Sequence, residues 1–383
     1  MNRAEIVVDV AAIRHNVRRL RAAVGGARMM TVVKSDGYGH GLGPVARAAR
    51  AGGADWLGVA TIDEALALRA TGDAGPVLCW LGVPGEEYAA AIERDIDVTA
   101  YSLDELAEVT KGARAAGRQA RLQLKVDTGL SRGGAMQADW TELVRAARAA
   151  EQDGDVAVTG IWSHFACSDE PAHPANDAQE AAFRSALEIA HTAGLRPSVR
   201  HLSNSAAALL RPSARFDLVR CGIASYGLDP APGHTPAVLP GLGLIPAMTV
   251  RAALAMVKRL PAGGSVSYGH TWTADRPTTL GLVPAGYGDG ILRHASGRAE
   301  VWVDGRRRPI RGRVCMDQFV VDLDSDLPAA GSRVVLFGAG ADGEPTAQDW
   351  AEACGTISYE IVTRVGGRMR RIHVDSEAEE HRA

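Results

Sequence analysis

The sequence is short of lysine, aromatic residues and long apolar runs. Only four of its 42 basic residues are lysines, and aromatic residues make up 5% of its 383 residues. No apolar run approaches the roughly 20 residues that a membrane-spanning helix needs, so we expect no membrane contact. The net charge is -3 and the chain contains no basic block, which argues against binding to nucleic acid.

The five cysteines also exclude two common kinds of site. The closest two are 39 positions apart and none forms a C-x-x-C pair, so we predict neither a zinc ribbon nor a dithiol redox centre, and no metal site. We expect reduced, mostly buried thiols. The first residues lack an apolar segment followed by a small-residue cleavage site, so the protein is expected to stay in the cytoplasm.

The scarcity of lysine limits which residues could form a Schiff base. A desolvated lysine can form a Schiff base, whereas arginine stays protonated and cannot. Any imine chemistry would therefore have to use Lys34, Lys111, Lys125 or Lys258. Lys111 and Lys258 belong to no motif and are expected to be solvated.

The first 240 residues alternate short apolar runs with longer alanine-rich segments. The eight runs predicted to be strands are Met29–Lys34, Trp56–Ala60, Val77–Gly82, Asp97–Tyr101, Arg121–Asp127, Val158–Ala166, Ser198–Ser203 and Asp217–Gly222. Segments such as Leu103–Ala116, Trp140–Ala150 and Gln179–Ala193 place apolar residues on one face and are predicted helices. This α/β alternation predicts an N-terminal (β/α)8 barrel of the TIM type over residues 1–240, with an open doubly wound sheet as the structural alternative.

After Gly241 the pattern changes to hairpins with few helices. The segment Val301–Gly305 ends in Asp-Gly, which favours a tight turn. Predicted strands are Thr278–Val283, Arg313–Leu323 and Arg333–Phe337, with one helix over Ala347–Ala353. Because a chain of this length exceeds the roughly 250–300 residues of a single core, we expect a second, mainly β domain over residues 241–383.

Lys34 stands where a predicted barrel strand ends and its loop begins. Barrel enzymes place their catalytic groups on that face. The alternative is a lysine whose ammonium group simply reaches solvent at a strand end. The glycines that follow do not form the G-x-G-x-x-G pattern of a dinucleotide site.

The segment Val32–Gly41 closely resembles the pyridoxal-phosphate lysine motif of the alanine racemases. Further matches follow in the family's order along nearly the whole chain: Lys125–Gly133, Trp162–Ala166, Ser203–Ser205, Val219–Ile223, Val266–Gly269, Gly286–Gly290 and Arg313–Gln318. The resemblance implies an amino-acid isomerase that uses pyridoxal 5'-phosphate to interconvert L-alanine and D-alanine, which supplies D-alanine for peptidoglycan.

The resemblance also implies a two-base mechanism. Lys34 would hold the cofactor as an imine and serve one face of the substrate, while Tyr268 would serve the other. His164 matches the residue that bonds this tyrosine. Arg220 would face the pyridine nitrogen, where a donor-only guanidinium keeps that nitrogen largely unprotonated.

Other matching residues would hold the phosphate and the substrate. The phosphate contacts are implied for Tyr38, Asn204, Ser205, Gly222, Ile223 and Tyr226. The substrate carboxylate would meet the Arg132 guanidinium and the backbone N–H of Met316. Lys125 matches a lysine that is carbamylated in the family. The family's Arg-Val-Pro-Arg segment is replaced by Gly367–Arg370, and we expect no tyrosine before it.

Because Tyr268 and Met316 lie in the second domain, the resemblance implies a homodimer with two shared active sites. Three alternatives stay open: a broad-specificity racemase that also accepts serine, a decarboxylase on the same two-domain plan, and a non-catalytic pyridoxal-phosphate carrier. A carrier of that kind would not need residues 241–383, and Tyr268 and Cys315–Gln318 belong to the racemase pattern rather than to that of the decarboxylases.

Overall fold

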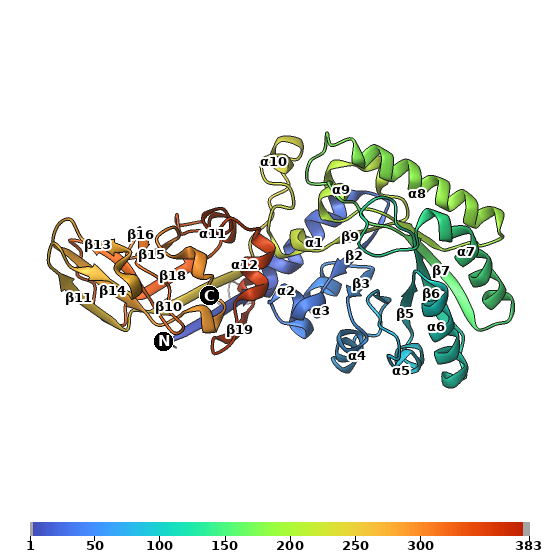
Figure 1. Ribbon diagram of the computed structural model, residues 1–383, viewed down its shortest axis with the longest axis horizontal. Coiled ribbons are helices and arrows are strands. Elements are labelled where there is room, and N and C mark those ends of the chain that lie inside the picture. The colour runs from blue at the N-terminus through green and yellow to red at the C-terminus, as the bar shows by residue number, and fades with distance from the viewer. Residues whose placement is uncertain (1–2, 378–383) are drawn as a thin grey trace.

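The computed structural model describes residues 3–377 and consists of a barrel and a mainly β domain that lie side by side (Figure 1). The barrel is the part with the outer ring of helices, and the second domain carries the N-terminal and C-terminal ends of the described chain (Figure 1). Among residues 3–377, no helix is both long and apolar enough to cross a bilayer.

Eight parallel strands form the barrel wall, which confirms the predicted architecture. They are β2 (Arg28–Val32), β3 (Trp56–Val59), β4 (Val77–Cys79), β5 (Ile96–Ala100), β6 (Ala120–Lys125), β7 (Val156–Trp162), β8 (Val199–His201) and β9 (Leu218–Cys221). They are ordered β8-β7-β6-β5-β4-β3-β2-β9. The N–H of Asp217 donates to Arg200 O (3.1 Å) and that of Arg220 to Ser203 O (3.0 Å), so the backbone also links the two outermost strands. The doubly wound alternative is therefore wrong.

Helices cover the outside of the barrel and follow local sequence signals. They are α1 (Val10–Val24), α3 (Leu42–Ala51), α4 (Ile62–Ala70), α5 (Tyr88–Glu93), α6 (Leu103–Ala116), α7 (Gln137–Gln152), α8 (Ala175–Thr192) and α9 (Ser205–Leu210). At the start of α4, Thr61 and Glu64 form a capping box, and Ser102 caps α6 by accepting from Glu105 N. Leu106 and Val109 of the predicted apolar face of α6 are buried, whereas Leu103 and Ala107 are exposed.

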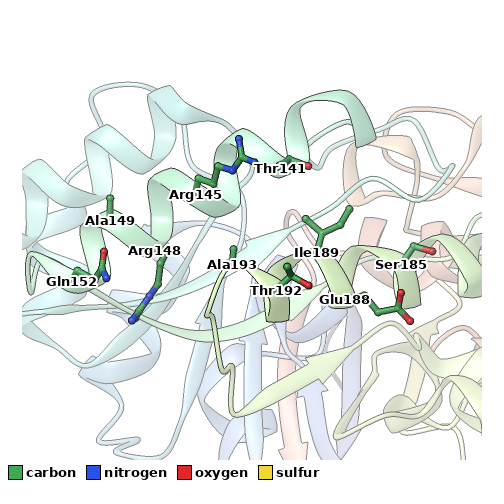
Figure 2. A pocket seen from close by; sticks show the side chains of 10 residues that line it. All are labelled: Thr141, Arg145, Arg148, Ala149, Gln152, Ser185, Glu188, Ile189, Thr192 and Ala193. Carbon is green, nitrogen blue, oxygen red and sulfur yellow. The ribbon is translucent and has the colours of Figure 1, made fainter.

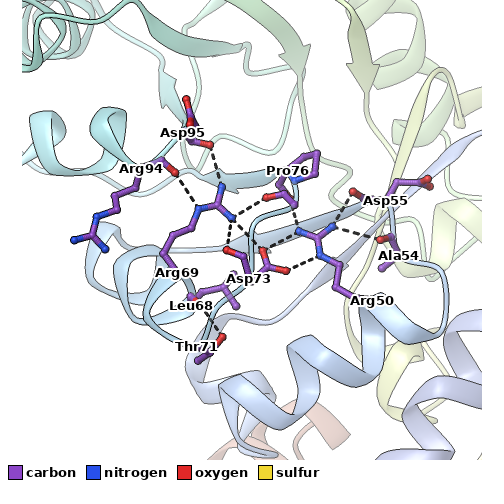
Figure 3. A network of polar contacts seen from close by, with 11 residues as sticks. Arg50, Ala54, Asp55, Leu68, Arg69, Thr71, Asp73, Pro76, Arg94 and Asp95 are labelled. Atoms are coloured by element: carbon purple, nitrogen blue, oxygen red, sulfur yellow. Dashed lines mark hydrogen bonds and ion pairs between the residues drawn. The ribbon is translucent and has the colours of Figure 1, made fainter.

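A buried ionic network ties the amino-terminal ends of the barrel strands together (Figure 3). Asp73 lies between Arg50 and Arg69: its carboxylate accepts from Arg50 Nε (2.8 Å) and from Arg69 Nη1 (3.0 Å). The two guanidinium groups also donate to the carbonyls of Pro76 and Gly75, just before β4. This network is at the opposite end of the barrel from the predicted site.

The second domain is built around a nine-stranded sheet. Its order is β11-β14-β17-β16-β15-β18-β10-β1-β19. The bounds are β1 (Ala4–Asp9), β10 (Met248–Ala253), β11 (Met256–Leu260), β14 (Thr278–Val283), β15 (Glu300–Val303), β16 (Arg306–Arg311), β17 (Phe319–Asp324), β18 (Arg333–Phe337) and β19 (Arg370–Val374). Shorter elements are α10 (Thr235–Val238), β12 (Ser265–Val266), β13 (Trp272–Thr273), α11 (Ala347–Cys354) and α12 (Ser358–Arg364).

Three features differ from the sequence-based expectations. Strand β1 lies within residues 1–240, but it pairs antiparallel with β10 and parallel with β19, so it is part of the nine-stranded sheet rather than of the barrel. Ile6 and Val8 of β1 are fully buried, which favours its place inside the larger sheet. Residues 313–318 form a loop rather than the first part of a strand, and helix α12 was not predicted.

Candidate active site

A cavity of about 590 Å³ opens at the carboxyl-terminal ends of the barrel strands. Its lining brings together most of the predicted site residues: Lys34, Tyr38, Lys125, Arg132, His164, Asn204, Ser205, Arg220, Gly222 and Ile223. Residues that sequence reasoning did not single out also line it: Trp80, Tyr101, Trp162, Tyr359 and Thr363. Among the described residues of the lining, four are cationic and none is acidic, so the cavity suits an anionic ligand.

Lys34 enters this cavity from the start of α2 (Lys34–Tyr38), directly after β2. Burial lowers the pKa of its amine, and the neighbouring charge of Arg132 lowers it further, against a smaller opposing effect of Glu64. A lowered pKa increases the fraction of neutral amine, which is the nucleophilic form. Lys34 therefore has the environment of a reactive lysine.

The backbone after Lys34 is left-handed. Ser35, Asp36 and Tyr38 have φ angles of 53°, 52° and 53°. Each such residue costs about 1–2 kcal/mol relative to a right-handed conformation, because Cβ approaches the following carbonyl oxygen. Gly39 continues the turn, and a side chain there would collide with the carbonyl oxygen of Val362 in α12.

Lys125, at the end of β6, is the second lysine of the cavity and, unlike the half-buried Lys34, is buried. Its Nζ lies 4.6 Å from the centre of the Trp162 ring. Burial lowers the pKa of Lys125 to about 8, with help from the charges of Arg132 and Arg220. Arg132 itself lies on the exposed loop after β6, whose turn is stabilised by Asp127 Oδ1, which accepts from Gly129 N (2.8 Å).

Arg220 of β9 is almost fully buried, yet it contacts no carboxylate among the described residues. Its Nη2 donates to the carbonyls of Ser163 (2.7 Å) and Leu202 (3.0 Å). Burial lowers the pKa of Arg220 to about 9, chiefly through the loss of hydration. The buried guanidinium group of Arg220 is thus stabilised by hydrogen bonds to neutral acceptors alone.

A directional chain of hydrogen bonds links Arg220 to a buried carboxylate. Arg220 Nη1 donates to His201 Nδ1 (2.8 Å), so the ring proton of neutral His201 sits on Nε2, which donates to Gln123 Oε1 (2.7 Å). Gln123 Nε2 in turn donates to Asp97 Oδ2 (2.9 Å). Because a carboxylate only accepts hydrogen bonds, Asp97 fixes the orientation of the Gln123 amide group. The amide oxygen of Gln123 then faces His201 and accepts the proton on its Nε2. Sequence reasoning missed these three residues, which lie on strands β5, β6 and β8.

His164 is neutral and oriented by Arg220. Burial lowers the pKa of His164 well below its usual value, and the charge of Arg220 lowers it further. Because His164 Nδ1 accepts from Arg220 Nη2 (3.1 Å), its proton lies on Nε2. His164 can therefore donate one hydrogen bond to a group that enters the cavity.

The segment around Ser205 and Gly222 forms a close-packed polar corner. Gly222 N donates to Ser205 Oγ (2.8 Å), and Asn204 Oδ1 caps α9 by accepting from Ala207 N (3.1 Å). Gly222 is needed at its position, because a Cβ there would collide with the Tyr38 hydroxyl oxygen. That hydroxyl therefore lies directly against the loop after β9.

The structure does not bring Tyr226 together with the other predicted site residues. Its side chain is fully buried behind Tyr38 and does not line the cavity, and its hydroxyl donates to Val32 O (2.9 Å). Tyr359 of α12 lines the cavity instead, with its ring 6.2 Å from that of Tyr38. The comparison of Gly367–Arg370 with the family segment found no tyrosine preceding it. Tyr359 was missed because it stands eight residues before Gly367, outside the segment that was compared.

Tyr268 and Met316 do not reach the cavity of their own chain. Tyr268 begins a short helical turn (Tyr268–His270) of the second domain and is 73% exposed, and Met316 is 55% exposed. The loop of Met316 packs against Gly286–Gly288, where Gly288 N donates to Met316 O (2.8 Å), and the hydroxyl of Ser267, next to Tyr268, donates to Arg313 O (2.7 Å). A single chain therefore presents these two side chains on its surface.

A second hollow, of about 650 Å³, lies on the outer face of the barrel between α7 and α8 (Figure 2). Its polar lining includes Arg145, Arg148 and Glu188. It contains none of the predicted site residues, and it lies away from the strand ends where barrel enzymes place their chemistry.

Comparisons with known proteins identify the family of the chain. The alanine racemase N-terminal domain matches residues 8–230, and the alanine racemase C-terminal domain matches residues 247–373. Alanine racemase of Streptomyces coelicolor is 55% identical over 97% of this chain and 96% of its own, and that of Thermobifida fusca is 55% identical over 97% and 98%.

Solved structures give the same result. The crystal structure of alanine racemase from D-cycloserine producing Streptomyces lavendulae has a TM-score of 0.96 at 54% identity and covers 100% of this chain and 99% of its own. The alanine racemase from Corynebacterium glutamicum has a TM-score of 0.85 at 39% identity, over 98% and 100%. The chain belongs to the alanine racemase family, a family of isomerases.

Proposed function

We propose that the protein interconverts L-alanine and D-alanine with pyridoxal 5'-phosphate held covalently on Lys34. The observation that carries this proposal is the half-buried side chain of Lys34, with its lowered pKa, in a cavity lined by cations and by no described acidic residue. When bound, the cofactor supplies an electron sink for the electron pair that remains once Cα loses its proton.

The residues present fit this cofactor. A phosphate would fit the polar corner formed by the hydroxyl groups of Ser205 and Tyr38, because Gly222 between them has no side chain. Further contacts would come from the neighbouring cavity residues Asn204, Ile223 and Tyr359. We assign the pyridine nitrogen to Arg220. Because Arg220 only donates and is anchored by four carbonyl or imidazole partners, it would leave that nitrogen largely unprotonated.

Racemisation requires a proton to leave one face of Cα and another to arrive on the opposite face. Lys34 would accept or donate the proton on one face, and Tyr268 of the partner subunit would do so on the other. A phenol needs a hydrogen bond to its charged form to act as a base near neutral pH. His164 Nε2, which carries the proton of the neutral ring, would donate that bond.

The substrate carboxylate would be held by Arg132 and by the backbone N–H of Met316 of the partner subunit. We further propose that Lys125 is carbamylated. Its pKa of about 8 leaves an appreciable fraction of neutral amine near neutral pH, and this form reacts with carbon dioxide. The resulting anion would offset the surrounding positive charge of Arg132 and Arg220.

The protein would act as a homodimer in the cytoplasm and supply D-alanine for peptidoglycan. The surface positions of Tyr268 and Met316 support a dimer, because neither can serve the cavity of its own chain. A second copy placed head to tail would bring both side chains to the partner's cavity and would complete two sites at once.

One experiment tests the proposal. The purified protein, reconstituted with pyridoxal 5'-phosphate, should show an imine absorbance band, and borohydride reduction should label the peptide that contains Lys34. The labelled preparation should lose its activity, while untreated protein should abolish the optical rotation of L-alanine. A colourless protein, or a label on another lysine, would contradict the proposal. Assays with serine measure how tolerant the pocket is of a hydroxymethyl group.

A further inference from the structure

The turn that carries Lys34 into the cavity receives support from both domains of the chain. From the barrel, Glu64 Oε1 accepts from Ser35 N (2.6 Å), and Asp36 Oδ1 accepts from Leu42 N (2.7 Å). These two bonds hold the beginning and the end of the left-handed segment. They do not by themselves explain why three non-glycine residues keep an unfavourable backbone.

The second domain supplies the remaining contacts, through α12 and β19. Arg371 Nη1 of β19 binds Asp36 Oδ2 (2.7 Å), and two residues further along β19, His373 Nε2 donates to His40 O (2.7 Å). The carbonyl of Val362 in α12 packs against Gly39. In Figure 1, α12 lies beside α2, where the second domain meets the barrel, and β19 is the edge strand of the nine-stranded sheet. The turn is thus held between the barrel helices α3 and α4 on one side and the second domain on the other.

We propose that Asp36 and Arg371 form a positioning pair for the Lys34 amine, acting across the two domains of one chain. Asp36 is two residues from Lys34, and its carboxylate closes the turn with one oxygen while it binds β19 with the other. A shift of β19 is therefore transmitted to Lys34. Since proton transfer is sensitive to displacements of about 1 Å, the pair acts on the rate of the step that Lys34 performs. This inference rests on the proposed role of Lys34 as one of the two bases.

The pair can be tested without unfolding the protein. Asp36 is 52% exposed and Arg371 27% exposed, so their attraction contributes little to global stability. Asp36→Asn keeps the oxygen that accepts from Leu42 N, and asparagine tolerates a left-handed backbone, so this variant removes mainly the charge. Arg371→Gln removes the other partner. Arg370→Gln, at the neighbouring exposed position on β19, is the matched control.

The full-length holoenzyme gives the first readout. We expect each single variant to lower kcat by about 5- to 10-fold with KM changed less than about twofold, and the double variant to be no slower than the slower single one. With Cα-deuterated substrate, the isotope effect should increase for only one enantiomer, the one whose proton Lys34 removes. The control should stay within about twofold of the parent protein. Additive losses, or isotope effects that rise equally for both enantiomers, would overturn the proposal.

Hydrogen exchange gives a second readout, which does not depend on the cofactor. In the full-length protein without added cofactor, the Leu42 amide should exchange at least about 5-fold faster in Asp36→Asn and in Arg371→Gln than in the parent protein. In the control Arg370→Gln its exchange rate should equal that of the parent protein. Equal protection in all four proteins would refute the clamp. A parent protein that neither binds pyridoxal 5'-phosphate nor racemises alanine would disprove the proposed function, whereas the exchange result would still decide whether Arg371 holds the turn.

Discussion

Replacing Asp73 by alanine should lower the free energy of unfolding of the barrel without changing the rate of racemisation. The Asp73 carboxylate accepts from Arg50 at 2.8 and 3.0 Å and from Arg69 at 3.0 Å (Figure 3). The side chains of Asp73 and Arg69 are each 9% exposed, and that of Arg50 is 21% exposed. Removing the carboxylate therefore leaves two largely buried guanidinium groups without their shared counter-ion.

The size of the loss follows from that burial. Breaking a buried pair by removing one partner costs about 3–5 kcal/mol. Both arginines keep carbonyl acceptors, such as Pro76 O for Arg50 and Gly75 O for Arg69, which favours the lower limit of about 3 kcal/mol. For domains of this size each kcal/mol changes the melting temperature by about 2–4 °C, so we expect a decrease of about 6–12 °C.

Thermal unfolding followed by circular dichroism, at one fixed protein concentration, measures this change. Asp177→Ala is the control: Asp177 also binds an arginine, Arg211, at 2.6 Å, but its side chain is 84% exposed. Its removal should cost less than about 1 kcal/mol. The racemisation rate of Asp73→Ala at 25 °C should equal that of the parent protein. If the two variants melt at the same temperature, burial of the Asp73 network does not have the effect that we assign to it.

Three further predictions concern the site. Tyr268→Phe should lower racemisation at least about 100-fold while the cofactor absorbance is retained; rates that stay the same in both directions would exclude a second base at this position. Arg220→Glu should raise transamination relative to racemisation, because the carboxylate favours a protonated pyridine nitrogen; product analysis with an unchanged ratio would contradict this. Burial lowers the pKa of Lys125 from 10.5 to about 8, so the unfolded chain binds a proton that the folded chain lacks between these values. The free energy of unfolding of the parent protein should therefore rise by about 3 kcal/mol between pH 8 and 10.5, compared with the change in Lys125→Met over the same range. Urea titrations in carbon-dioxide-free buffer measure this difference. A difference that does not vary with pH would refute the assigned pKa.

Much of the barrel could be predicted because its signals are local. Strands buried on both faces appear as short apolar runs, and each of the eight predicted runs overlaps one observed strand, with bounds that differ by up to four residues. Lys34 was recognised from its place at a strand end and from the residues that follow it. The cavity confirms that Lys34, Lys125 and Arg220 converge, although they are far apart in the sequence.

The misses have a common cause, which is pairing over long distances in the chain. Strand β1 alternates buried residues like any strand, and only its register with β10 and β19 places it in the second sheet. By residue type, Tyr226 and Tyr359 cannot be told apart. The packing of Tyr226 behind Tyr38 and the position of α12 beside the cavity bring Tyr359, and not Tyr226, into the cavity lining.

The sequence by itself determined the order of strands and helices, the scarcity of lysine that singles out Lys34, and the family motifs, because each depends on neighbours within a few residues. Only the tertiary structure decided that Asp97 reaches Arg220 through Gln123 and His201, that Arg371 holds the turn after Lys34, and that Tyr268 lies outside the cavity of its own chain. These relations depend on which strands lie side by side when the barrel and the sheet close, and on the low exposure that makes each buried charge require a partner.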